Sequence, residues 1–125
     1  MNLSELQLGD WVHVEGKKDP VQITSLACDG SIEVNNEYYC TIEDLSPVEL
    51  TDEIVEKRFE RVECRYELPF GENRVGLVQL GHWEYQTNWC CFVNAFPHEM
   101  RMTVTNVHEL QHIFRLFGLK QEVIL

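Results

Sequence analysis

Hydrophobic and polar residues alternate in short runs through the first fifty residues of the chain. Residues 11–14, 21–24 and 32–34 each place apolar side chains at every second position. Alternation with a period of two predicts short strands with one buried face. Asp29-Gly30 lies between the second and third runs and predicts a hairpin with a type I′ turn.

A fourth run, EYYCTI at 37–42, follows a further turn at Asn35-Asn36. Four strands this short, each half apolar, are expected to close on one another. We therefore predict a small SH3-like β-barrel module over residues 1–50.

The pattern changes to that of a helix after residue 50. Thr51 is a candidate N-cap, and two acidic residues follow it, where they favour the positive end of a helix dipole. Ile54, Val55 and Phe59 then form an apolar side. A short amphipathic helix is expected at the start of a second module.

Strands return after this helix. Residues 61–68 alternate strictly and predict one half-buried antiparallel strand with Val62, Cys64, Tyr66 and Leu68 facing inward. Two strands at 74–85 and 88–96, joined near Thr87-Asn88, and one at 99–105 are expected next. The second of these three is apolar on both faces, which is typical of a strand covered on both sides.

Residues 107–117 form an apolar stripe with helical spacing at Leu110, Ile113, Phe114 and Phe117. Asn106 is a candidate N-cap and Gly118 a candidate C-terminal stop. The expected fold class is α+β: the SH3-like module of residues 1–50, followed over 51–125 by a helix, a four-stranded antiparallel sheet and a C-terminal helix. The connection near residue 50 is short and apolar, so we expect rigid docking.

The C-terminal helix contains HELQH at 108–112, a full match to H-E-x-x-H. In zinc peptidases this spacing presents two imidazoles on one helix face, and the glutamate acts as general base for a zinc-bound water. On that interpretation His108 and His112 are metal ligands, Glu109 is catalytic, and an upstream His82 or His98 supplies the third ligand.

Three observations favour an ordinary helix instead. His108 and His112 lie almost opposite the apolar stripe on a helical wheel, so they are expected to point away from the core. The extended form of the motif would need glycine and histidine where Arg115 and Gly118 stand. Glu109 is placed to close a capping box with Asn106. We therefore predict no catalytic residue, no metal site and no cofactor.

Five cysteines occur without a C-x-x-C spacing: Cys28, Cys40, Cys64, Cys90 and Cys91. An odd number in apolar runs indicates thiols in a reducing compartment. The first ten residues lack the basic and apolar regions of a secretory signal, and no apolar run has the length of a membrane helix. A cytoplasmic protein without membrane contact is expected.

The net charge is −11 and lies mostly in the first half of the chain. Residues 1–60 hold 14 acids and 4 bases, which gives −10, whereas residues 61–125 hold 7 acids and 6 bases, which gives −1. An acidic half repels phosphate backbones, so direct binding to nucleic acid is disfavoured. It suits a basic protein partner, or imitation of nucleic acid toward a protein that binds it.

The strand GDWV at 9–12, the junction LSPVELT at 45–51 and the helix VHELQH at 107–112 carry a resemblance over nearly the whole chain. The chain resembles a group of small uncharacterised proteins from Bacteroidales-type genomes and their prophages. This resemblance implies an accessory role in a mobile element and no known activity.

We therefore expect a small acidic, non-catalytic protein-interaction or accessory module of mobile-element origin. Two alternatives stay open: a zinc-dependent hydrolase that uses the HELQH helix, and a nucleic-acid-mimicking inhibitor of a DNA-binding protein. Most of the aromatic residues, Tyr38 and Tyr39 among them, are interpreted as core because strand positions favour them there.

Overall fold

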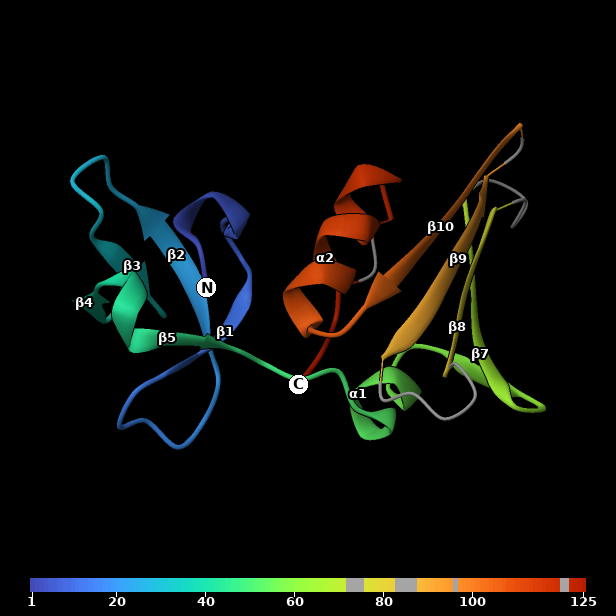
Figure 1. Cartoon of the computed structure of the whole chain (residues 1–125), viewed down its shortest axis with the longest axis horizontal. Helices are drawn as coiled ribbons and strands as arrows, with labels where there is room; N and C mark the ends of the chain where they lie inside the picture. The colour runs from blue at the N-terminus through green and yellow to red at the C-terminus, as the bar shows by residue number, and fades with distance from the viewer. Residues whose placement is uncertain (72–75, 83–87, 96, 120–121) are drawn as a thin grey trace. The chain divides into compact units, whose positions relative to one another are not determined.

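The chain folds as an α+β protein, mostly strands arranged in two antiparallel sheets (Figure 1). The computed structural model describes residues 1–71, 76–82, 88–95, 97–119 and 122–125. Two compact units are formed, one by Met1–Glu49 with Asn106–His108 and the other by Leu50–Thr105 with Glu109–Leu125.

The first unit is a five-stranded sheet with the order β4-β3-β2-β1-β5, in which every pairing is antiparallel. Its strands are β1 (Trp11–Val14), β2 (Val21–Leu26), β3 (Ile32–Val34), β4 (Tyr38–Cys40) and β5 (Leu45–Pro47). Two single turns of 3-10 helix also belong to it, η1 (Leu3–Glu5) and η2 (Ile42–Asp44).

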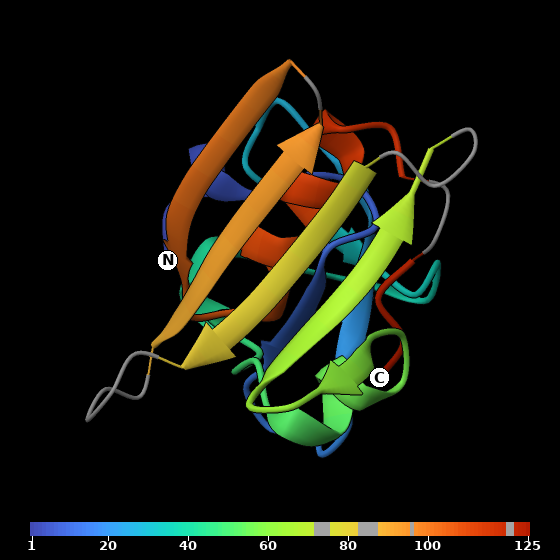
Figure 2. The ribbon, with the colours of Figure 1, turned by 90° about the vertical axis from the view of Figure 1, so that its right-hand side faces the viewer.

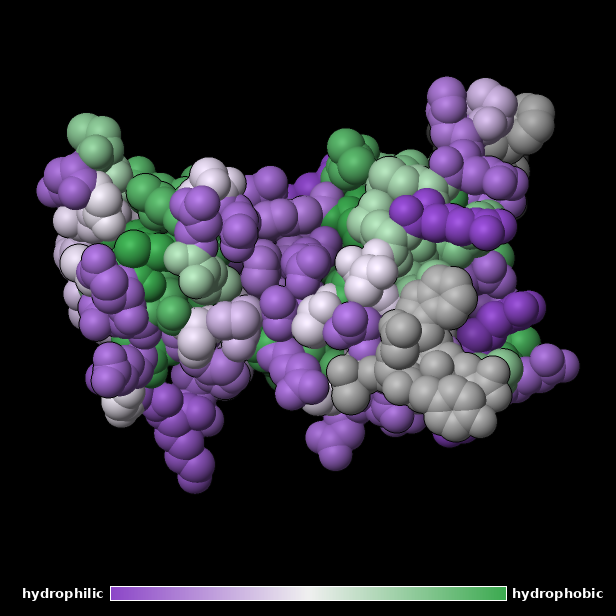
Figure 3. Space-filling model, in the orientation of Figure 1, coloured by the Kyte–Doolittle hydropathy of each residue, from purple (hydrophilic) through white to green (hydrophobic). Residues whose placement is uncertain are grey.

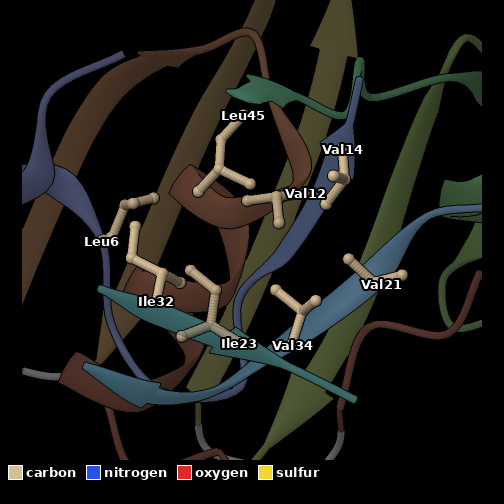
Figure 4. Close-up of a cluster of buried hydrophobic side chains, with 8 residues drawn as sticks. All are labelled: Leu6, Val12, Val14, Val21, Ile23, Ile32, Val34 and Leu45. Atoms are coloured by element: carbon tan, nitrogen blue, oxygen red, sulfur yellow. The ribbon is translucent and has the colours of Figure 1, made fainter. Parts of the chain in front are cut away.

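Burial in β1, β2 and β3 alternates along each strand, as the period of two predicted. The inward side chains form one hydrophobic core, drawn in Figure 4: Leu6, Val12, Val14, Val21, Ile23, Ile32, Val34 and Leu45. Because aliphatic side chains of this size each stabilise by about 1.5–3 kcal/mol when fully buried, this cluster is the main source of stability in the first unit.

The type I′ turn lies one hairpin later than predicted. The β2–β3 loop turns through Cys28 and Asp29 into Gly30, and only Gly30 has a positive φ, at 92°. That is a three-residue loop with a left-handed glycine. Asn35 and Asn36 instead have φ values of 52° and 57°, the mark of a type I′ turn. Asparagine tolerates the left-handed region because its short amide can bond to nearby backbone.

β4 and β5 are the edges of the first sheet. Among the pairings of the described residues, none joins these two strands and closes a barrel. Thr24 lies at a register shift in β2, and a bulge of this kind bends a strand. The finer SH3-like geometry stays a prediction.

The second unit holds a five-stranded meander with the order β10-β9-β8-β7-β6 (Figure 2). Its elements are α1 (Asp52–Glu56), β6 (Glu60–Val62), β7 (Arg65–Phe70), β8 (Gly76–His82), β9 (Trp89–Ala95), β10 (His98–Val104) and α2 (Val107–Leu116). α2 packs against one face of this sheet, where Phe114 meets Phe59 and Phe117 meets Phe70, with ring centroids 6.0 and 6.3 Å apart.

The prediction of one continuous strand over 61–68 is wrong. The chain reverses at Glu63, whose φ is 58°, so that Arg61 pairs with Tyr66 and Val62 with Arg65. Val62 therefore lies on the opposite face from Tyr66, and Cys64 is exposed in the turn. A two-residue turn shifts the alternation by one position, so Arg61 rather than Val62 shares a face with Tyr66. The apolar pattern, which continues without a break from Val62 to Leu68, gave no sign of that shift.

The expected strands at 74–85, 88–96 and 99–105 correspond to β8, β9 and β10 within the described residues. Of the predicted junction at Thr87-Asn88, Thr87 lies outside those residues. β9 is not fully covered on both faces: Trp89, Cys91 and Val93 are buried, but the other side of the strand is only half-buried.

α1 begins and α2 ends where their capping residues predicted. The Thr51 hydroxyl accepts a hydrogen bond from the Ile54 backbone N–H at 3.4 Å. At the end of α2, Gly118 has φ 69° and Leu119 N–H donates to the Phe114 carbonyl at 2.8 Å, which is a Schellman ending. Within the described residues, neither helix is long and apolar enough to cross a membrane.

Candidate functional site

The HELQH residues lie on α2, but the histidines are not both solvent-facing as predicted. His108 is buried, with only 5% of its surface exposed, and His112 is half-buried. Gln111 is buried as well. The buried side of α2 is therefore wider than its apolar stripe.

The first turn of α2 contacts another part of the chain than the apolar stripe does. Asn106–His108 groups with the first unit, whereas the stripe that follows belongs to the second. Val107 N–H donates to the Val48 carbonyl at 2.8 Å, and Asn106 forms a bridge with Glu49. A helical wheel considers only the spacing of apolar residues within the helix. It therefore does not predict contacts that the first turn makes with a separate segment such as Val48–Glu49.

Glu109 acts at the start of α2, though one residue away from the predicted contact. Its Oε1 accepts a hydrogen bond from the Thr105 backbone N–H at 3.3 Å, where the capping box expected the N–H of Asn106. A carboxylate in this place also interacts well with the positive end of the helix dipole. Glu109 therefore has a structural role that does not depend on a metal.

Neither of the predicted third ligands is shown beside the HELQH histidines. His82 Nε2 lies 3.1 Å from Asp52 Oδ1, and His98 is exposed at the start of β10. In the part of the chain that the structure describes, no three histidine, cysteine or acidic side chains are grouped so as to hold a metal ion. Among the residues that the structure describes, the HELQH motif has no completed coordination set.

The cysteines divide by exposure. Cys28 and Cys64 are exposed, Cys40 and Cys90 are half-buried, and Cys91 is buried; all five are free thiols. Burial, and next the neighbouring Cys90, raises the pKa of Cys91 to about 12. A thiol with that pKa stays protonated near neutral pH, so Cys91 is unsuited to act as a nucleophile.

Polar side chains gather where α1 meets the sheet of the second unit. The Asp52–His82 pair lies at the surface, and the His82 ring stacks on Trp89 with centroids 3.8 Å apart. Tyr66 Oη donates to Glu56 Oε1 at 2.9 Å, and burial followed by this bond raises the pKa of Tyr66. Because Trp89 and Tyr66 are buried, these contacts help to fix α1 on the sheet.

Trp89 was predicted to be a core residue, and it is. Its indole N–H donates to the Leu50 carbonyl at 2.9 Å, which satisfies the polar end of a buried ring. Trp83 and Tyr85, two further aromatic residues, lie outside the described residues.

Tyr39 is the aromatic residue that the core interpretation placed wrongly, since it is 65% exposed. It lies on edge strand β4 and pairs across the sheet with Glu33. A hydrogen bond with Glu33, and next the charge of that carboxylate, raises the pKa of Tyr39. Adjacent strand residues point to opposite faces, so the pair Tyr38-Tyr39 already indicated that one of the two rings points outward.

Tyr39, Glu33 and Thr24 form what we call the β4 surface. The Thr24 hydroxyl donates to Glu33 Oε1 at 3.0 Å and accepts from the Asn36 backbone N–H at 3.1 Å. These bonds hold the Glu33 carboxylate beside the exposed Tyr39 ring. The arrangement presents a flat aromatic face with a fixed negative charge next to it.

The charge around the β4 surface is strongly acidic. Residues 1–49 contain ten acids and two lysines, so their net charge is 2 − 10 = −8. Lys17 is already placed over the Tyr38 ring, 4.9 Å from its centroid. Figure 3 shows hydrophobic residues lying between hydrophilic ones on the face of this unit that the view presents.

Comparison with protein-family models, with curated proteins and with solved structures finds no match to the chain.

Proposed function

We propose that this chain is a non-catalytic protein-interaction module whose first unit binds a basic protein partner through the β4 surface. The observation that carries the proposal is Tyr39, a large aromatic side chain 65% exposed on an edge strand beside Glu33. Tyrosine is enriched among the residues that dominate binding energy in protein interfaces.

The charge of the first unit supports a basic partner. A unit with net charge −8 attracts cationic surfaces at long range, which raises association rates more than it raises final affinity. The edge position of β4 adds unpaired backbone groups that a partner strand can use. We also propose that the first sheet is curved as in an SH3-like barrel, as the strand pattern predicts. The resemblance to small prophage proteins implies that the module has an accessory role in a mobile element, and we include this role in the proposal.

The test compares three immobilised forms of the full chain in extracts of the cells that produce it. The wild type should retain a partner that Tyr39→Ala loses by tenfold or more, because truncating a central aromatic residue costs roughly 2 kcal/mol or more. Leu8→Ala is the matched control, since Leu8 is an exposed apolar residue of the same unit, 58% exposed. Quantitative mass spectrometry of the retained proteins gives the measurement.

Salt and DNA separate the remaining possibilities. Retention should weaken as ionic strength rises from about 0.05 to 0.5 M, because screening shortens the reach of the acidic field. A partner released by duplex DNA would support the nucleic-acid mimic in place of this proposal. Equal retention by the wild type and Tyr39→Ala would show that the β4 surface is not the binding site.

A further inference from the structure

β10 is a long edge strand without a bulge or a proline. It is seven residues long and pairs with β9 in one unbroken register from His98 to Val104. Natural edge strands are commonly short, bulged, or carry proline or charged residues that discourage pairing. The charges of β10 are Glu99 and Arg101, which are of opposite sign. β6, at the other edge of the same sheet, is only three residues long. In the described residues no strand covers the free side of β10, the outermost ribbon of the sheet in Figure 2.

The two faces of β10 differ in character. Met100 and Met102 face inward and pair with the buried residues Val93 and Cys91 of β9. Glu99 and Arg101 are exposed on the outer face, where Arg101 lies over the Phe92 ring, 5.2 Å from its centroid. One acidic and one basic side chain therefore stand two residues apart on the same face.

This spacing is complementary to itself. In an antiparallel pair of two β10 strands around a twofold axis at Met100, Glu99 faces Arg101 of the second copy, and Arg101 faces Glu99 of that copy. Opposite charges directly across an antiparallel pair stabilise it, whereas like charges destabilise it. An axis at Glu99 or at Arg101 would instead set identical charges against each other, and an axis at Met102 would pair neither charge with its opposite, so the charges favour the axis at Met100.

We propose that two copies of this chain dimerise through β10, with Met100 at the twofold axis, to form a continuous ten-stranded antiparallel sheet. An axis perpendicular to the sheet keeps the Glu99 and Arg101 side chains of both copies on one face. The inward Met100 and Met102 side chains then become more buried at the seam. The proposal uses the second unit alone and does not depend on the binding proposed for the β4 surface.

The dimer is expected to be weak. A seam of two edge strands buries less area than a standard interface, so the dissociation constant should be on the order of 100 µM. Sedimentation velocity of the full chain should show reversible dimers that increase with concentration. A monomer over the whole range from about 10 µM to 1 mM would overturn the proposal.

Charge reversals test the register. Glu99→Arg and Arg101→Glu each replace two attractive pairs with two repulsive ones, and each should weaken the dimer about tenfold or more. The double variant with both changes restores opposite charges across the seam and should dimerise like the wild type. Glu60→Arg, which changes the same charge on the β6 edge, is the control and should have no effect. Thermal unfolding of each variant checks that it folds.

Cross-linking provides an independent measurement. In a background where the exposed Cys28 and Cys64 are changed to serine, Met100→Cys should form an intermolecular disulfide between the two copies of position 100. Met102→Cys should not, because its counterpart across the axis is His98. Rescue in the double charge variant together with selective cross-linking at position 100 supports the proposal. Dimers that survive either single charge reversal, or that Tyr39→Ala abolishes, would place the interface elsewhere.

Discussion

At the scale of single residues, burial decides the chemistry of the thiols. Cys90 and Cys91 are neighbours in β9, yet they point to opposite faces of the strand, and only Cys91 is fully buried. The folded chain disfavours the thiolate of Cys91 because the charged form would lose its hydration. The pKa of Cys91 is accordingly raised from 9.0 to about 12.

This shift predicts a loss of stability at alkaline pH. An unfolded chain releases the Cys91 proton above pH 9.0, whereas the folded chain keeps it up to about pH 12. Between pH 9.0 and about pH 12 the unfolded state therefore binds fewer protons than the folded state. The ionisation of Cys91 then lowers the free energy of unfolding by about 1.4 kcal/mol for each pH unit in this range.

Urea unfolding of the wild type and of Cys91→Val at pH 8 and pH 10 measures the effect. The wild type should lose roughly 1 kcal/mol more than Cys91→Val, which has a similar shape and no ionisable group. Cys64→Ser, altered at an exposed thiol, should follow the wild type. Equal losses in the wild type and Cys91→Val would contradict the raised pKa.

At the scale of elements, α2 is a helix whose ends and apolar side follow from nearby residues. Gly118 ends it, and Leu110, Ile113 and Phe114 are all buried as the helical spacing predicted. His108 is buried as well, although it lies off the apolar stripe and its segment, Asn106–His108, groups with the first unit. Within the HELQH motif, His108 thus groups with the first unit and residues 109–112 group with the second.

A pair of substitutions in α2 separates the buried stripe from the exposed side. Phe114→Ala should reduce the free energy of unfolding by about 3–5 kcal/mol, since the ring is 3% exposed and stacks near Phe59. Leu116→Ala removes an apolar side chain that is 70% exposed, and should change stability by less than about 0.5 kcal/mol. Urea denaturation of both variants checks the ordering, and similar costs for the two would contradict the packing of α2.

At the scale of the whole molecule, the acidic charge is uneven. Residues 1–49 carry a net charge of −8, and residues 50–125, with eight bases and eleven acids, carry 8 − 11 = −3. Self-repulsion of a net charge destabilises a compact state. The core of the first unit offsets this repulsion by burying aliphatic side chains.

Salt should therefore stabilise the protein. Raising NaCl from about 0.01 to 0.15 M shortens the screening length from about 30 to 8 Å and weakens repulsion among the acids of the first unit. We expect the midpoint of thermal unfolding to rise by a few degrees, measured by circular dichroism. Glu33→Gln, which removes one of these charges, should show a smaller rise. A midpoint that falls with salt would mean that favourable ion pairs outweigh the repulsion.

The sequence by itself determined the features that depend on a few neighbouring residues. Alternation predicted β1, β2 and β3, and Thr51 and Gly118 predicted where α1 begins and α2 ends. These features are local because side-chain direction and backbone capping are set within one or two turns of chain. The α+β class followed from the same patterns.

Only the tertiary structure decided the features that depend on distant residues. His108 is buried by packing that its own helix does not specify, and the reversal at Glu63 became visible only through the pairing of β6 with β7. The β4 surface likewise needs Thr24, Glu33 and Tyr39 from three strands. A hydrophobic pattern states which residues avoid water, but the register of strands and the contacts of a helix end are fixed by which segments meet, and that choice is made by the whole fold.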